Sequence, residues 1–207
     1  MTEKLYSLQK ITSAATSVNS KKVPRLFSLV KDWQSGTRNL DYGGGRYDTA
    51  TEYLAARGVT NCIYDPYNRS QEENRKVMNF WKYDTCTISN VLNVIKEKEM
   101  RSWILADAIL EVRNDAKIYV TVYEGNGSGV GCLTKKDCWQ NNQPISFYEK
   151  EIREEANKWS SNGGLTITVE RKGPLIIVTP HADESKLPEI VENYTKAHAK
   201  KRKGKRS

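Results

Sequence analysis

Apolar residues recur along the chain at two spacings, one typical of helices and the other of strands. Helical spacing predicts helices at 24–33, 48–57, 70–80, 97–112 and 146–159, and a further helix from about residue 188 onward. Short β-rich runs predict strands at 39–42, 61–64, 84–89, 117–123, 165–170 and 175–179. A loop of about twenty residues with four glycines follows the strand at 117–123, and ordered loops of this length are often functional.

Polar residues at the predicted helix ends support these boundaries. Asp48 can cap the helix that follows the first strand, and a Ser-x-x-Glu capping box occurs twice, at Ser70–Glu73 and at Ser146–Glu149. We therefore expect the capping side chains of these three helices to come from their own first turns.

The order of the elements predicts an α/β fold. Strands alternate with helices through most of the chain, and two strands around Arg171-Lys172-Gly173-Pro174 form a hairpin near the end. We expect a three-layer, Rossmann-like sheet that is mostly parallel and ends in an antiparallel C-terminal hairpin. An ordinary dinucleotide-binding domain lacks that closing hairpin.

Two acids and a glycine cluster stand where such a sheet binds ligands. Asp41 ends the first strand, Gly43-Gly44-Gly45 follows it, and Asp65 ends the next strand 24 residues after Asp41. Ligands of open α/β sheets bind beyond the carboxyl ends of the strands, where an acid at the second strand accepts hydrogen bonds from ribose. Asp41 would repel a pyrophosphate, so the two acids favour a cationic nucleoside without phosphate, a description that S-adenosylmethionine meets.

These residues resemble a known family. LDYGGGRYDTATEYLAARG resembles motif I of class I (Rossmann-like) S-adenosylmethionine-dependent methyltransferases, and YDPYN resembles the acidic motif II. ISNVLNVI resembles the segment after a strand at which the adenine and the methionine carboxylate are often contacted. The resemblance covers roughly 38–180 and is nearest to small methyltransferases of bacteria and phages. It implies S-adenosylmethionine as cofactor, held by Asp41, Tyr42, Gly43, Gly44, Gly45, Asp65, Pro66, Tyr67, Ser89, Asn90 and Val91.

The chain departs from the family pattern in two places. Arg46 and Tyr47 stand where the third glycine of motif I is usual, so the turn should differ in detail. Only 19 residues separate Asp65 from Asp84, which is too short for the usual helix, strand and helix. We expect the third strand of the family's sheet to be reduced or absent.

Catalytic residues are harder to identify, because the methyl group of S-adenosylmethionine is already activated and the protein mainly aligns the reactants. Ser89-Asn90-Val91-Leu92 stands in place of the Asp/Asn-Pro-Pro-aromatic motif of amino-methylating DNA enzymes. Asn90 and Glu124 are the two weak catalytic candidates. Asn90 and Asn93 either contact the cofactor or cap a helix after the strand, and Glu124 could be a solvated acid at the end of a strand.

The positive charge is concentrated at the two ends of the chain. The formal net charge is +8, yet the middle of the chain is slightly acidic. We divide the chain into a polar N-terminal arm (1–22), a methyltransferase domain (23–195) and a basic tail (196–207). The tail is either a solubilising segment or a phosphate-binding one, so nucleic acid is a candidate partner. Its cations include Lys200, Lys201, Arg202, Lys203, Lys205 and Arg206.

Composition also limits the location and the kinds of site that we expect for this protein. No apolar run approaches the length of a membrane span and the N-terminus lacks a signal-peptide core, so we expect a cytoplasmic protein without a membrane partner. Cys132 and Cys138 are interpreted as free thiols, and no metal site is expected because the two histidines lie far from them. Four aromatic residues could stack on bases or belong to the core: Tyr6, Trp81, Tyr83 and Trp139.

Three hypotheses for function remain open. The first is a methyltransferase acting on a macromolecule, with nucleic acid as one candidate acceptor. The second is an enzyme that cleaves S-adenosylmethionine without methylating anything. The third is a binding module that keeps the cofactor fold and uses its basic tail on a nucleic acid or a protein.

Overall fold

The computed structural model describes residues 9, 11, 21–78, 83–161, 165–186, 189 and 192. The basic tail and the helix expected from about residue 188 fall largely or wholly outside these residues, as does most of the N-terminal arm. Within the described part of the chain, no helix is long and apolar enough to cross a membrane.

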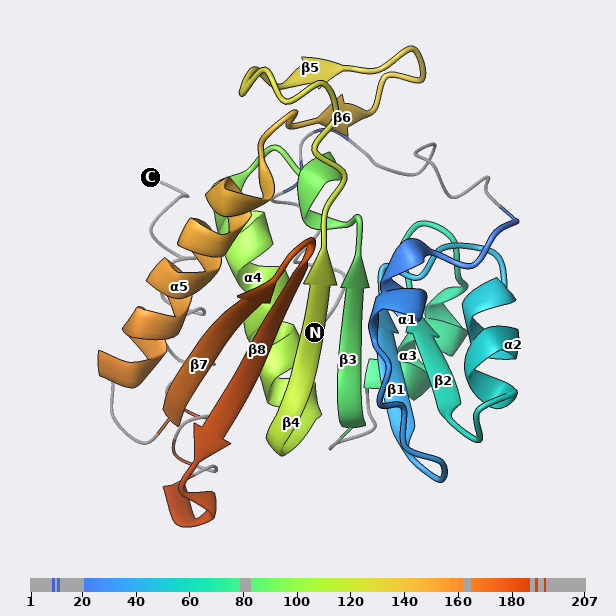
Figure 1. Cartoon of the computed structure of the whole chain (residues 1–207), viewed down its shortest axis with the longest axis vertical. Coiled ribbons are helices and arrows are strands. Elements are labelled where there is room, and N and C mark those ends of the chain that lie inside the picture. Colours follow the sequence, from blue (N-terminus) through green and yellow to red (C-terminus); the bar gives the residue numbers. More distant parts are fainter. Residues whose placement is uncertain are drawn as a thin grey trace.

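A six-stranded sheet forms the centre of the molecule (Figure 1). Its order is β2-β1-β3-β4-β8-β7, with parallel pairing from β2 to β4 and antiparallel pairing from β4 to β7. A separate antiparallel pair, β5–β6, lies within the glycine-rich loop. The strands are β1 (Arg38–Tyr42), β2 (Thr60–Tyr64), β3 (Tyr83–Ser89), β4 (Val112–Thr121), β5 (Cys132–Leu133), β6 (Trp139–Gln140), β7 (Leu165–Lys172) and β8 (Leu175–Ala182).

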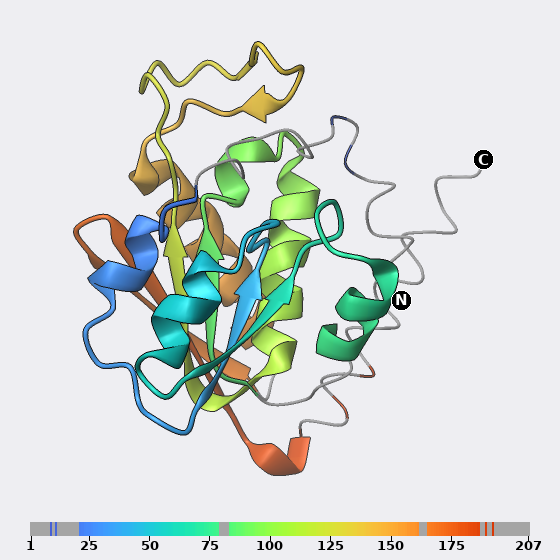
Figure 2. The same ribbon diagram turned by 90° about the vertical axis from the view of Figure 1, so that its right-hand side faces the viewer.

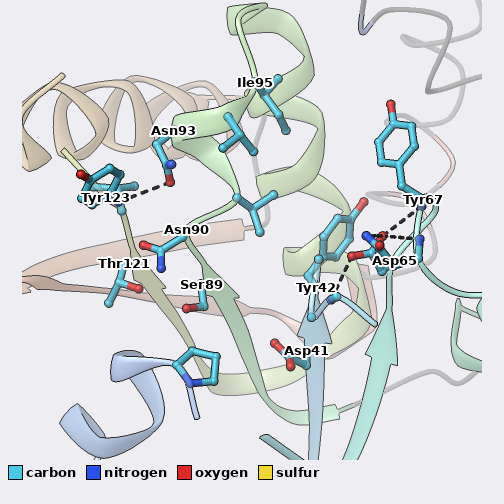
Figure 3. Close-up of a pocket in the computed structure, with 18 of the residues that line it drawn as sticks. Asp41, Tyr42, Asp65, Tyr67, Ser89, Asn90, Asn93, Ile95, Thr121 and Tyr123 are labelled. Carbon is cyan, nitrogen blue, oxygen red and sulfur yellow. Dashed lines mark hydrogen bonds between the residues drawn. The ribbon is translucent and has the colours of Figure 1, made fainter. Parts of the chain in front are cut away.

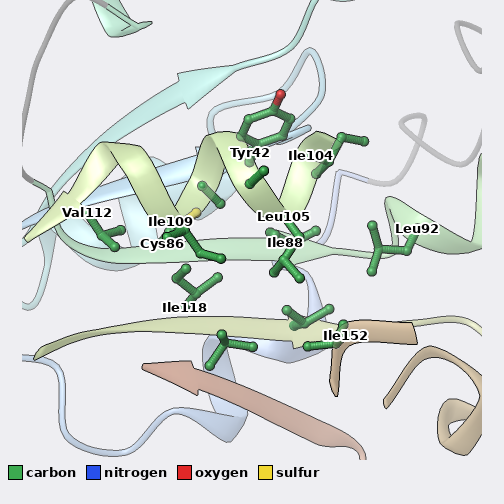
Figure 4. Close-up of a cluster of buried hydrophobic side chains, with 14 of the residues drawn as sticks. Tyr42, Cys86, Ile88, Leu92, Ile104, Leu105, Ile109, Val112, Ile118 and Ile152 are labelled. Carbon is green, nitrogen blue, oxygen red and sulfur yellow. The ribbon is translucent and has the colours of Figure 1, made fainter. Parts of the chain in front are cut away.

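Helices cover both faces of the sheet (Figure 2). Side chains of α4 and α5 pack with the sheet in the largest apolar cluster, whereas those of α1 and α2 lie in two smaller clusters. The larger cluster places Leu105 and Ile109 of α4 beside Ile88 and Ile118 of the central strands (Figure 4). The helices are α1 (Arg25–Leu29), α2 (Thr49–Ala55), α3 (Gln71–Met78), α4 (Lys98–Glu111) and α5 (Ile145–Ser161), with 3₁₀ turns η3 (Leu92–Val94) and η4 (Glu184–Lys186).

The predicted fold class is confirmed. The sheet is mostly parallel and closes with the β7–β8 hairpin, as expected from the sequence. β2 is an edge strand, and the described residues contain no strand beyond it. The chain passes from the end of α3 at Met78 to the start of β3 at Tyr83 with too few residues for another strand and helix, which explains the missing third strand.

Two predicted helix boundaries are wrong, and in each case a side chain outside the helix contacts the backbone near that boundary. The first helix ends at Leu29 instead of Trp33, whose ring folds back on Phe27 and whose Nε1 donates to the Phe27 carbonyl at 3.2 Å. The helix expected from Ser146 begins at Ile145, and the carboxylate of Glu124 accepts its N–H at 2.5 Å. The Ser70–Glu73 capping box is confirmed, with reciprocal bonds of 2.8 and 3.2 Å.

Two other regions are more ordered than expected. The strand predicted at 117–123 is β4, which begins at Val112 directly after α4 and ends at Thr121. The glycine-rich segment is not a simple loop, because it contains the β5–β6 hairpin, which extends beyond the carboxyl ends of the central strands (Figure 1). The hairpin therefore lies at the edge of the sheet where ligands of this fold class bind.

Candidate functional site

The glycine turn after β1 requires glycine for two separate reasons. Gly43 and Gly45 adopt φ angles of +76° and +78°, a backbone region that favours glycine. A Cβ atom on Gly43 would also lie 2.5 Å from a methyl group of Val91, which follows β3. The N–H of Gly43 donates to the Tyr64 carbonyl of β2 at 2.7 Å, so the turn is fixed to its neighbouring strand.

Gly44 leaves room for the carboxylate of Asp41. A Cβ atom at Gly44 would lie 2.5 Å from Asp41 Oδ2. Asp41 is 1% exposed, and its Oδ1 accepts a hydrogen bond from the Thr87 hydroxyl at 3.0 Å. Its buried Oδ2 has no hydrogen-bond partner of ordinary geometry among the described residues. The carboxylate thus lies directly below the glycine turn with one oxygen unsatisfied.

Burial raises the pKa of Asp41 from 3.8 to about 6. The Thr87 hydroxyl and the Asn61 amide lower the pKa, and the nearby carboxylate of Asp65 raises it. An unsatisfied buried oxygen on a titratable acid is costly to the free protein, and such groups often mark functional sites.

A network of polar side chains supports Asp41 from below. Thr87 accepts a hydrogen bond from the Asn39 amide at 3.0 Å, and the same amide donates to Asn61 at 2.8 Å. The Thr85 hydroxyl donates to the side-chain oxygen Oδ1 of Asn39 at 2.8 Å. These residues belong to β1, β2 and β3, so the network joins the three strands below the acid.

Asp65 holds the glycine turn together as well as facing the cavity. Its Oδ2 accepts the N–H of Gly45 at 2.9 Å, and its Oδ1 accepts the backbone N–H groups of Tyr67 and Asn68 at 2.9 and 3.0 Å. The Asn68 side-chain amide also donates to Oδ1, at 3.1 Å. A carboxylate offers about four acceptor positions, so the remaining capacity of Asp65 for a ligand lies mainly on Oδ2.

The capping role predicted for Asp48 is wrong. The residue occupies the position before α2, but its side chain makes no hydrogen bond to the helix. It accepts instead from Arg69 at 2.7 Å, and the Arg69 Nε donates to the Gly45 carbonyl at 2.9 Å. Arg69 therefore joins the glycine turn to the start of α2.

The end of β3 supplies a second unsatisfied group. The Ser89 Oγ atom is buried and has no hydrogen-bond partner in the described part of the chain. Asn90 follows at a φ of +57°, which asparagine tolerates better than most residues, and its N–H donates to the Thr121 carbonyl at 2.9 Å. Asn90 does not cap η3, and the buried Asn93 amide donates to Gln140 of β6 at 3.1 Å.

All eleven residues predicted to hold the cofactor line one cavity of about 930 Å³. Figure 3 shows Asp65 and Tyr67 on one side of it, Asn90, Thr121 and Tyr123 on the other, and Asp41 and Ser89 between them. Pro66 is part of the lining beside Asp65. The two acids and the glycine turn therefore converge on one space, as the sequence predicts.

Glu124 does not line this cavity. Its side chain is exposed, and its carboxylate binds the first N–H of α5 as described above. Cys132 and Cys138 are free thiols, the first exposed and the second buried. The described residues contain no group of three His, Cys, Asp or Glu side chains that could hold a metal.

Several cavity residues have no signal in the local sequence. Gln9 of the N-terminal arm accepts a hydrogen bond from the Tyr67 hydroxyl at 2.9 Å. The Tyr42 hydroxyl donates to Asp107 of α4 at 3.2 Å, and burial raises the pKa of that acid to about 6. Other lining residues come from the segment before α1 and from the β5–β6 hairpin: Lys22, Pro24, Arg25, Thr134, Lys135, Lys136 and Trp139.

No model of a known protein family matches this chain, and no curated protein matches it. Among solved structures, it is similar to the 1,6-didemethyltoxoflavin N1-methyltransferase of Burkholderia thailandensis, solved with 1,6-didemethyltoxoflavin and S-adenosylhomocysteine bound. The two share 16% identity with a TM-score of 0.51 over 72% of each chain. A methyltransferase from Methanosarcina mazei matches 77% of this chain and 97% of its own, with 11% identity and a TM-score of 0.47. This protein therefore has the fold of the class I S-adenosylmethionine-dependent methyltransferases.

Proposed function

We propose that this protein is a methyltransferase that binds S-adenosylmethionine in the cavity above Asp41 and Asp65. The observation that carries the proposal is the pair of unsatisfied buried atoms, Asp41 Oδ2 and Ser89 Oγ, whose residues line one cavity at the ends of adjacent strands. Buried polar groups without partners are rare in folded proteins, and a ligand with hydrogen-bond donors would remove the cost of both.

The residues around the cavity suit this cofactor in both charge and shape. Asp41 and Asp65 are the two acids of the lining, and they suit an ammonium group and ribose hydroxyls. The glycine turn brings backbone close to the ligand without side chains. Val91, Ile95 and Ile104 supply an apolar wall that fits an adenine ring.

The bound cofactor would supply an activated methyl group. The chain would then need only to hold the acceptor in line with that methyl and to exclude water, and alignment alone can contribute about 7–11 kcal/mol. Such a reaction needs a general base only where the acceptor must lose a proton. Asn90 remains a candidate for contact with the acceptor because it lies on the cavity wall opposite Asp65 (Figure 3).

We further propose a macromolecular acceptor, with nucleic acid as the first candidate. The support is the concentration of basic residues at the ends of the chain, because clustered cations attract a polyanion. The B. thailandensis enzyme was solved with 1,6-didemethyltoxoflavin bound, so a small-molecule acceptor belongs among the compounds tested.

The test is methyl transfer from S-adenosylmethionine labelled in the methyl group. The full chain is incubated with single-stranded DNA, RNA, protein extract or a small-molecule pool, and label in each fraction is measured. Label that depends on an added acceptor supports the proposal. Degradation of the cofactor without acceptor would favour the cleaving enzyme, and absence of cofactor binding in calorimetry would favour the binding module.

A further inference from the structure

The cavity has a second side that is formed mainly by residues outside the predicted cofactor set. Asp41, Asp65 and the glycine turn belong to the ends of β1 and β2, whereas Asn90 follows β3, Thr121 ends β4 and Tyr123 lies two residues further on (Figure 3). A volume of about 930 Å³ is near the upper end of the range for small-molecule sites, which is roughly 300–1,000 Å³. The cavity thus has room for a second molecule beside a nucleoside cofactor.

The charges of the lining are sorted by depth. Its two acids, Asp41 and Asp65, are buried at 1% and 5% exposure. Among the described residues, the lining also contains five exposed cations. Arg46 follows the glycine turn, two lie before and at the start of α1, and two lie in the turn between β5 and β6: Lys22, Arg25, Lys135 and Lys136. An entering molecule would therefore meet positive charge at the mouth before it reaches the acids at the floor.

Tyr123 presents an aromatic ring on a fixed backbone. Its side chain is 62% exposed, although it lines the cavity. Its N–H donates to the buried Asn93 at 3.4 Å, and its carbonyl accepts from the buried Gln140 at 3.0 Å. An exposed ring on an anchored backbone can stack on a planar group with little loss of conformational freedom.

The lysine turn is anchored to the same part of the molecule. The Asn141 amide, one residue after β6, donates to the carbonyls of Leu92 and Ile95 at 3.1 and 2.9 Å. The Trp139 ring of β6 lies 4.5 Å from the Lys96 ammonium, and its Nε1 donates to Asn141 at 2.6 Å. The hairpin therefore holds its two turn lysines at a defined side of the mouth.

We propose that this side of the cavity binds a nucleotide, with the base stacked on Tyr123 and phosphate bound by the cations of the mouth. The inference rests on the proposed function, because it names the acceptor that shares the cavity with the cofactor. Stacking on an aromatic ring together with contact of cations to phosphate is how proteins bind single-stranded nucleic acids without sequence preference. The same chemistry would accept a free nucleotide or one unit of a strand.

The test measures binding of a fluorescent, unstructured tetranucleotide to the full chain saturated with S-adenosylhomocysteine. Tyr123→Ala should weaken binding about tenfold, whereas Tyr123→Phe should bind like the wild type because its ring still stacks. Replacing both Lys135 and Lys136 by Gln should make the slope of log affinity against log salt less steep by about 1.4. Each lost phosphate contact accounts for about 0.7 of this change.

Two exposed lysines outside the cavity, Lys76 of α3 and Lys150 of α5, provide the matched control when both are replaced by Gln. This control should keep the wild-type slope. Unlabelled mononucleotide and unlabelled tetranucleotide are compared as competitors of the fluorescent probe. Equally strong competition by the mononucleotide would support a free nucleotide as the acceptor, and weaker competition would support a strand. Unchanged binding in the Tyr123→Ala and double-lysine variants would overturn the proposal, since binding would then arise elsewhere on the chain.

Calorimetry with S-adenosylhomocysteine separates this inference from the proposed function. All the variants should retain wild-type affinity for that compound. If the wild type does not bind it, the proposed function fails, whatever the tetranucleotide does. If the wild type binds it but shows no affinity for either nucleotide probe, only the nucleotide inference fails.

Discussion

Binding of the cofactor should depend on the ionisation of Asp41. Burial raises the pKa of this carboxyl to about 6, with a further contribution from Asp65 that the Thr87 hydroxyl opposes. The neutral acid cannot attract an ammonium group, so affinity should fall as the pH is lowered through this value. At pH 5 only about a tenth of Asp41 would be ionised in the free protein, so affinity should drop about tenfold between pH 7.5 and pH 5.

Calorimetric titration with S-adenosylhomocysteine provides the assay, because this compound carries the ammonium group and the ribose but no transferable methyl. The Asp41→Asn variant should bind more weakly at pH 7.5 and should lose the tenfold change between pH 7.5 and pH 5. A wild-type affinity that stays constant over this range would refute the reasoning, as would a variant with the wild-type pH profile.

The stability of the free protein should fall as the pH is raised over this range, whereas cofactor affinity should rise. Because the folded-state pKa of Asp41 lies above the usual 3.8, protonation of Asp41 stabilises the folded protein. This contribution to the free energy of unfolding is complete below pH 3.8 and is lost as the pH rises through about 6. Asp41→Asn should therefore raise the melting temperature at pH 7.5, by at most the equivalent of about 3 kcal/mol. A variant that melts below the wild type at pH 7.5 would contradict the cost assigned to the buried charge.

Three further changes test other parts of the structure. Gly44→Ala should lower the free energy of unfolding by about 1–3 kcal/mol and weaken S-adenosylhomocysteine binding, since the new Cβ lies against the buried Asp41 carboxylate. Gly127→Ala, which meets no atom within 4 Å, should leave that binding unchanged in the same titration. Glu151→Gln removes the charged partner of a buried arginine and should lower the free energy of unfolding in urea by about 3 kcal/mol. Glu154→Gln, in an exposed ion pair, should lower it by less than about 1 kcal/mol. Truncation after Thr195 should weaken nucleic-acid binding at moderate salt and spare S-adenosylhomocysteine affinity, and equal nucleic-acid binding by both forms would exclude a role for the tail.

The sequence predicts the part of the site that is built from neighbouring residues. The strand, glycine turn, helix and acid between Asp41 and Asp65 form one continuous segment, and the positive φ angles of Gly43 and Gly45 follow from local backbone requirements. The absence of the third strand could also be inferred, because the segment that would have to form it is too short. Local pattern is therefore sufficient for this half of the cavity.

The contacts that the sequence did not predict join residues far apart along the chain. Asp48 pairs with Arg69 instead of capping α2, and Glu124 binds the N-terminus of α5 in place of the expected capping box. Lys135 reaches the cavity only because the β5–β6 hairpin folds over the strand ends, far from the glycine turn in sequence. Such pairings depend on the tertiary fold, which local propensity does not specify.

The crystal structure of the full chain with S-adenosylhomocysteine is the most direct test of the cofactor site. We expect the ligand in the cavity above the glycine turn, with a nitrogen or hydroxyl donor within about 2.7–3.2 Å of Asp41 Oδ2. A ligand bound outside this cavity, or bound within it while Asp41 Oδ2 still lacks a partner, would contradict the account.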